Sequence, residues 1–161
     1  MKSADDFKSA ISAVRELMSA ANQEYLIYSH RTHNQLLVKP HPRIDGDARP
    51  VVFQIAYDQV LLMSRVELLK MHGFEVVSVL GNEAAKAALL ASPRHYSLFI
   101  IGSAGASQVR TEMAAWLKSH YPKIPILAIN PPFQQQLASA DYNITLNGPE
   151  EWLFIVQAAA A

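Results

Sequence analysis

Short apolar runs alternate with longer amphipathic stretches through the second two thirds of the chain. The apolar runs are rich in β-branched residues, as buried strands are, and the segments between them have apolar residues at helical spacing. The expected strands are 51–56, 74–80, 96–101, 124–129 and 142–146. The expected helices are 58–72, 82–92, 107–120, a short one around 132–139, and a last one opened by Pro149. This repeated alternation predicts a parallel sheet with helices on both faces.

The topology of such a sheet is narrowly constrained, because crossovers between parallel strands are right-handed. The commonest five-stranded arrangement is the doubly wound, flavodoxin-like order 2-1-3-4-5. We therefore expect an α/β domain over residues 51–161 with this strand order. Open sheets of this kind bind ligands at the carboxyl ends of their strands, so the residues that follow each strand are the first candidates for chemistry.

The first 50 residues follow a different pattern, and we treat 1–50 as a separate N-terminal part. Apolar residues at three- and four-residue spacing predict an amphipathic helix over 4–22, with Phe7, Ile11, Val14 and Met18 on one stripe. The β-prone runs "EYLIYS" and "QLLVKP" predict a hairpin. The stretch "KPHPRIDGDARP" has three prolines and a glycine, which is typical of a linker.

Composition excludes several classes of function. Fourteen Lys and Arg balance fourteen Asp and Glu, so no basic excess favours a nucleic acid or an anionic membrane as partner. The absence of cysteine excludes disulfides, thiolate metal sites and a thiol nucleophile. The charged N-terminus does not read as a signal peptide, and the apolar runs are too short to span a bilayer. We expect a cytoplasmic protein.

Four stretches, taken in order and at their spacing, resemble the receiver domain of bacterial response regulators over residues 51–161. They are "LLKMHGFEVVSVLGNEAAKAAL", "YSLFII", "LKSHYPKIPILAIN" and "ADYNITLNGPEEWL". The resemblance implies a CheY-like fold. In that family an Asp at the end of strand 3 accepts a phosphoryl group from a kinase. Two acidic residues that end strand 1 hold Mg²⁺ with it, while a Ser or Thr ends strand 4 and a Lys ends strand 5.

None of those functional groups stands at the matching position in this chain. The acidic pair falls on Ala56 and Tyr57, with Asp58 one position late, and the phosphoacceptor falls on Gly102. The hydroxyl position is Asn130, and the lysine position is Leu146 or Asn147. The resemblance therefore implies a degenerate pseudo-receiver. We expect no catalytic residue, bound metal or cofactor, and no enzyme activity.

Two other candidate sites, the loop after the third strand and a group of histidines, have simpler explanations. The loop "GSAGA" could bind an anion through backbone N–H groups at a helix start, but it lacks the spacing and the lysine of a P-loop. Ser103 in this loop has no base at a recognisable spacing, so we expect a solvated serine. The histidines His30, His33 and His41 could bind a metal but are expected to be solvated loop residues.

The last helix carries five consecutive apolar residues, more than a surface helix buries on one stripe. Trp152, Phe154 and Ile155, together with the stripe of the N-terminal helix, are therefore candidates for an interface. We expect phosphorylation-independent signalling by protein–protein contact, with a second copy, a kinase or another regulator as partner. The alternative is a small-ligand sensor that uses the cleft of Tyr57, Gly102, Ser103 and Asn130, where Gly102 would leave room for the ligand.

Overall fold

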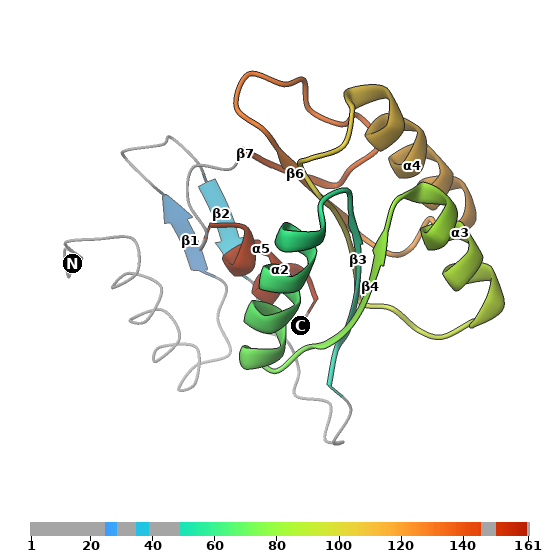
Figure 1. Cartoon of the computed structure of the whole chain (residues 1–161). Coiled ribbons are helices and arrows are strands. Elements are labelled where there is room, and N and C mark those ends of the chain that lie inside the picture. Colours follow the sequence, from blue (N-terminus) through green and yellow to red (C-terminus); the bar gives the residue numbers. More distant parts are fainter. Residues whose placement is uncertain (1–24, 29–34, 39–48, 146–150, 161) are drawn as a thin grey trace. The chain divides into compact units, whose positions relative to one another are not determined.

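The computed structural model of the chain describes residues 25–28, 35–38, 49–145 and 151–160, and it divides the chain into two compact units, Met1–Gly46 and Asp47–Ala161. In the first unit, strands β1 (Tyr25–Tyr28) and β2 (Gln35–Val38) pair antiparallel, as the predicted hairpin requires (Figure 1). The predicted helix over 4–22, with Phe7, Ile11, Val14 and Met18, lies outside the described residues, as do His30, His33 and His41.

The second unit is built on a five-stranded parallel sheet. Its strands are β3 (Val51–Ala56), β4 (Glu75–Leu80), β5 (Leu98–Ile101), β6 (Ile126–Asn130) and β7 (Tyr142–Thr145). Their order across the sheet is β4-β3-β5-β6-β7. This is the order 2-1-3-4-5 that the sequence predicted, and the prediction is confirmed.

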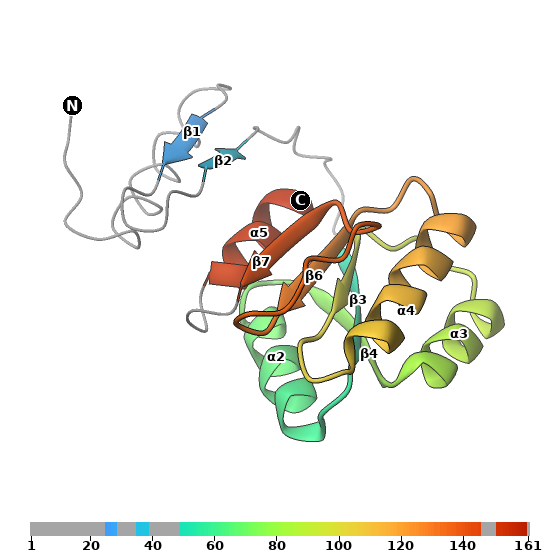
Figure 2. The same ribbon diagram turned by 90° about the horizontal axis from the view of Figure 1, so that it is seen from above.

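Four helices cover the two faces of this sheet. They are α2 (Gln59–Met71), α3 (Asn82–Ala91), α4 (Ser107–His120) and α5 (Glu151–Ala159). Helices α2 and α5 lie on one face, and α3 and α4 lie on the other (Figure 2). Among the described residues, no helix is long and apolar enough to cross a membrane.

Alternate strand residues fill the two core layers, because successive side chains of a strand point to opposite faces. Phe53 and Phe99 pack edge to face, with ring centroids 6.0 Å apart, in the layer under α3 and α4. Val52 and Ile100 point the other way, toward α2 and α5. Trp152 lies buried in that second layer, so the structure places this predicted interface residue in the core of its own chain.

The short helix predicted around 132–139 is wrong: an irregular connection joins β6 to β7 there. Phe133 has a φ of +66°, which a right-handed helix does not accommodate. Leu137 is buried in the core, and the side chain of Asn143 satisfies its backbone. Leu137 N donates to Asn143 Oδ1 at 2.9 Å, and Asn143 Nδ2 donates to Leu137 O at 3.0 Å. This long-range pairing replaces the hydrogen bonds that a helix would supply.

Candidate functional site

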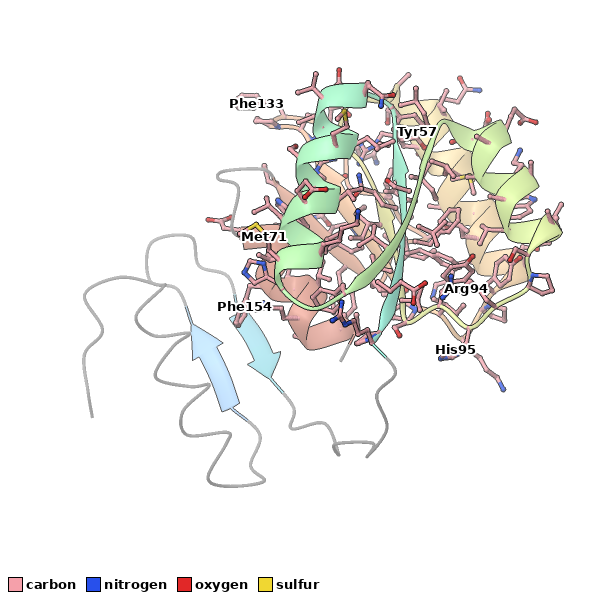
Figure 3. All side chains as sticks on the ribbon, turned by 60° about the horizontal axis from the view of Figure 1, so that its bottom comes forward. Tyr57, Met71, Arg94, His95, Phe133 and Phe154 are labelled. Carbon is pink, nitrogen blue, oxygen red and sulfur yellow. The ribbon has the colours of Figure 1, made fainter. Side chains whose placement is uncertain are left out.

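The carboxyl ends of β3, β5 and β6 meet at one edge of the sheet, as the parallel order requires. This brings Tyr57, Gly102, Ser103 and Asn130 to the same edge, while Ala56 is the buried last residue of β3. Leu146 and Asn147 lie outside the described residues. The edge lies at the opposite end of the sheet from Arg94 and His95, as the position of Tyr57 shows (Figure 3).

Gly102 follows β5 directly and donates its backbone N–H to Ile55 O at 2.9 Å. A Cβ on this residue would lie 3.0 Å from Arg65 Nη1 and 3.2 Å from Ile55 O. The expectation of open space beside Gly102 is therefore wrong, because a guanidinium from α2 occupies it.

Arg65 reaches this position from the middle of α2 and is only 4% exposed. Its Nη2 donates to Ser103 Oγ at 3.3 Å. Burial lowers the pKa of Arg65, and the nearby charge of Asp58 opposes this shift. Ser103 is itself buried, so the expectation of a solvated loop serine is wrong.

Arg110 enters from α4, on the other face of the sheet, and is fully buried. Its Nε donates to Gly102 O at 2.7 Å, and its Nη2 donates at 2.8 Å both to Ile129 O and to Asn130 Oδ1. Its Nη1 donates to Gln134 Oε1 at 3.3 Å. All four acceptors are neutral, and burial lowers the pKa of Arg110. The Arg110 side chain thus links the ends of β5 and β6 and the connection after β6 through hydrogen bonds.

Tyr57 closes the edge on the side of α3. Its hydroxyl donates to Asn82 Oδ1 at 2.7 Å, and Asn82 Nδ2 donates to Val109 O at 2.8 Å. Asn82 is the first residue of α3, and Gly81 is the N-cap of this helix. The Tyr57 ring lies against Gly105, where a Cβ would come within 2.7 Å of the ring atoms Cγ and Cδ2. Burial raises the pKa of Tyr57 to about 12.

Asp58 and Asn130 are also engaged in structural contacts at this edge. Asp58 is the N-cap of α2, where its Oδ1 accepts from Leu61 N at 2.9 Å. Asn130 is buried, and its Nδ2 donates to Asn143 Oδ1 at 3.0 Å while its Oδ1 accepts from Arg110. Among the described residues the edge therefore carries two guanidinium groups, and the nearby Asp58 carboxylate caps a helix.

Other predicted residues lie elsewhere. Phe154 and Ile155 are partly buried on α5, and Ile155 packs against the core layer under α2 and α5. Among the described residues, no three His, Cys, Asp or Glu side chains come together as ligands for a metal.

Sequence reasoning missed Arg65 and Arg110, although both interrupt a buried helical stripe. Arg110, Met113, Ala114 and Leu117 are the buried residues of α4, at the spacing that one helix face requires. Arg65 and Leu69 are the buried pair of α2, one turn apart. The signal in the sequence is an arginine at a position where the helical spacing predicts a buried apolar residue.

Comparisons of the sequence with models of known families and with curated proteins find no match. Solved structures do match. A response-regulator receiver domain protein from Clostridium thermocellum has a TM-score of 0.59 at 12% identity, covering 66% of this chain and 89% of that chain. Chemotaxis protein CheY4 of Vibrio cholerae has a TM-score of 0.59 at 15% identity, covering 71% and 100%. Response regulator TrrA of Thermotoga maritima, in complex with Mg²⁺ and BeF, has a TM-score of 0.57 at 14% identity, covering 66% and 94%. At these identities the likeness shows a shared receiver fold.

Proposed function

We propose that this chain, which has the receiver fold, is a pseudo-receiver: a signalling module that binds another protein and does not depend on aspartyl phosphorylation. The observation that carries the proposal is the Arg65 guanidinium beside Gly102, 3.0 Å from where a Cβ would lie. By the resemblance described above, this is the strand end that carries the phosphoacceptor in receivers. Any side chain at position 102 would require this guanidinium to shift.

The electrostatics of the edge also argue against phosphoryl transfer. Mg²⁺ is held by carboxylate and carbonyl oxygens, and it neutralises the charge of the phosphoryl group in flight. Tyr57 holds one of the matching positions, and the nearby Asp58 carboxylate accepts from Leu61 N as a helix cap. Two buried guanidinium groups add positive charge that repels a divalent cation.

The conformational switch of a receiver has no counterpart here. A receiver uses a hydroxyl at the end of its fourth strand to sense the phosphate, but Asn130 stands at this position. Arg110 and Asn143 bind its amide from two sides, at 2.8 Å and 3.0 Å. This buried network supports one fixed conformation, which suits a module that is always competent to bind its partner.

Exposed apolar side chains on β7 and on the connection that precedes it supply a candidate contact surface. Phe133, in the connection between β6 and β7, is fully exposed and has a positive φ, which is rare for an aromatic residue (Figure 3). Tyr142 on β7 is also exposed. In receivers the surface of helix 4, strand 5 and helix 5 is the usual output face, and here the connection takes the place of helix 4. We assign partner binding to this surface, with a second copy, a kinase or another regulator as the partner.

The phosphorylation part of the proposal has a direct test. The full chain is incubated with acetyl phosphate and Mg²⁺, beside a phosphorylatable receiver as positive control, and intact masses are measured. We expect the mass of this chain to stay unchanged while the control gains a phosphoryl group. Acid-labile phosphate on Asp58, the carboxylate nearest the matching position, would contradict the proposal.

The interaction part is tested by light scattering of the full chain in solution. We expect a dimeric mass, and we expect Phe133→Ser to shift it toward the monomer. Met71→Ser is the matched control, because Met71 is also exposed but lies at the C-terminal end of α2, away from Phe133 (Figure 3). A monomeric mass at every concentration would exclude a second copy as the partner. A cytoplasmic location remains part of this proposal.

A sensor that holds a small ligand in this cleft is the weaker candidate. Its cleft would be lined by Tyr57, Gly102, Ser103 and Asn130, but Arg65 covers Gly102 and the Tyr57 ring covers Gly105. A ligand at this edge would meet charge and hydrogen-bond donors rather than apolar volume.

A further inference from the structure

Two buried guanidinium groups contact the same dipeptide, Gly102–Ser103, from opposite faces of the sheet. Arg65 reaches it from α2, and Arg110 reaches it from α4. The ion pairs in the described part of the chain join other residues, such as Arg94 with Glu75 and Lys118 with Asp141. Buried charges in proteins are normally paired, because a charge is costly to remove from water.

The two arginines differ in how far the protein satisfies them. Arg110 donates to four acceptors, three of them at 2.8 Å or closer. Arg65 donates to one, Ser103 Oγ, at 3.3 Å. A guanidinium has five N–H groups, so most of the Arg65 donors have no acceptor among the described residues. No Arg65 nitrogen is both fully buried and without a partner, so the donors that lack a protein acceptor keep some contact with solvent and can bind an anion that arrives from it.

We propose that Arg65 and Ser103 bind an oxyanion of the phosphate class without forming a covalent bond. Arg matches such groups because its planar N–H donors engage two oxygens at once. Ser103 Oγ accepts from Arg65, which leaves its own hydroxyl hydrogen to donate to the anion. This inference goes beyond the interaction role of the pseudo-receiver and does not depend on it.

The surroundings of this pair favour an anion over a cation. Helix α4 begins at Ser107, just after the loop of Ser103, and its N-cap makes no side-chain hydrogen bond. Its first N–H groups add positive potential at the same edge. Asp58 is the carboxylate whose charge acts on Arg65, but it caps α2 and forms no ion pair within the described residues.

The test is a titration of the full ¹⁵N-labelled chain with inorganic phosphate against chloride at constant ionic strength. We expect saturable shifts of the Ser103 and Ala104 amides, with a Kd on the order of 1 mM. Arg65→Met should weaken binding at least about tenfold. Arg94→Met is the matched control and should leave it unchanged, because Arg94 pairs with Glu75 at the other end of the sheet (Figure 3).

A second variant and a second ligand make the result decisive. Ser103→Ala keeps the Arg65 charge and should weaken binding several-fold, which covers the case in which Arg65→Met does not fold. Glycerol phosphate, titrated in parallel, distinguishes the sources: tighter binding of the ester assigns the site to a phosphate monoester, and tighter binding of phosphate assigns it to the free ion. Shifts that do not saturate by about 10 mM phosphate, or equal affinity of the Arg65 and Arg94 variants, would overturn the proposal. Neither result alters the mass measured after acetyl phosphate, so the pseudo-receiver proposal stands or falls separately.

Discussion

Replacing Arg110 and Arg65 by methionine, one at a time, should affect the free energy of unfolding of the second unit differently: Arg110→Met should lower it, and Arg65→Met should not. Methionine keeps much of the length of the arginine stem and its packing, but it removes the charge and the donors. Both guanidinium groups are buried, so burial does not distinguish them. The number and length of their hydrogen bonds distinguish them.

The expected magnitudes follow from those hydrogen bonds. Arg110 makes three bonds of 2.7 to 2.8 Å, and each bond from a charged donor contributes about 1.5–3 kcal/mol. Removing the buried charge returns several kcal/mol of desolvation, so we expect Arg110→Met to lower stability by about 3–5 kcal/mol. The single Arg65 bond of 3.3 Å contributes no more than about 1 kcal/mol. Arg65→Met should therefore be neutral or should stabilise by up to about 2 kcal/mol.

The assay is urea unfolding followed by tryptophan fluorescence in phosphate-free chloride buffer. Both tryptophans, Trp116 and Trp152, lie in the second unit, so the signal reports on that unit. The midpoint at an unchanged m-value gives the change in stability, and Arg94→Met serves as the surface control. Equal losses for Arg65→Met and Arg110→Met would refute the reasoning, because Arg65 would then have acceptors as good as those of Arg110.

Three further predictions concern the same edge. Gly105→Ala should cost about 1–3 kcal/mol, since its Cβ would lie 2.7 Å from the Tyr57 ring. Gly102→Ala should cost less, because its Cβ would lie 3.0 Å from a flexible arginine tip and 3.2 Å from Ile55 O. The reverse ranking of the two variants in urea unfolding would contradict this packing. Because the Tyr57 pKa is about 12 and not 10.0, its contribution to stability is full below pH 10 and is lost as pH rises toward 12, and Tyr57→Phe should lose less stability over this range. Asn143→Ala leaves the buried N–H and C=O of Leu137 without partners and should cost about 2 kcal/mol or more; unchanged amide exchange at Leu137 would count against it.

Much of the fold was predictable from local pattern. Runs of β-branched residues and amphipathic stretches predicted every strand and four of the helices of the second unit within a few residues. The right-handed crossover rule then selected the strand order, which the structure confirms. These features depend on periodicity over neighbouring residues, which a single sequence displays directly.

The helix expected around 132–139 shows where local pattern fails. Its apolar spacing is compatible with a helix, but Leu137 is buried with its backbone bonded to the side chain of Asn143. The stability of that arrangement comes from a residue on the next strand. Propensity is a weak preference and yields to such a tertiary contact.

The sequence by itself determined that no acidic residue stands at Gly102 and that glycines and a serine follow β5. Only the tertiary structure decided what fills the space beside Gly102. Arg65 and Ser103 lie 38 residues apart, and Arg110 comes from the opposite face of the sheet. A parallel sheet gathers the ends of distant strands and helices at one edge, so the charge of that edge depends on packing between segments. The absence of an acidic residue at position 102 is visible in the sequence, whereas the cations beside this position become visible only once the chain has folded.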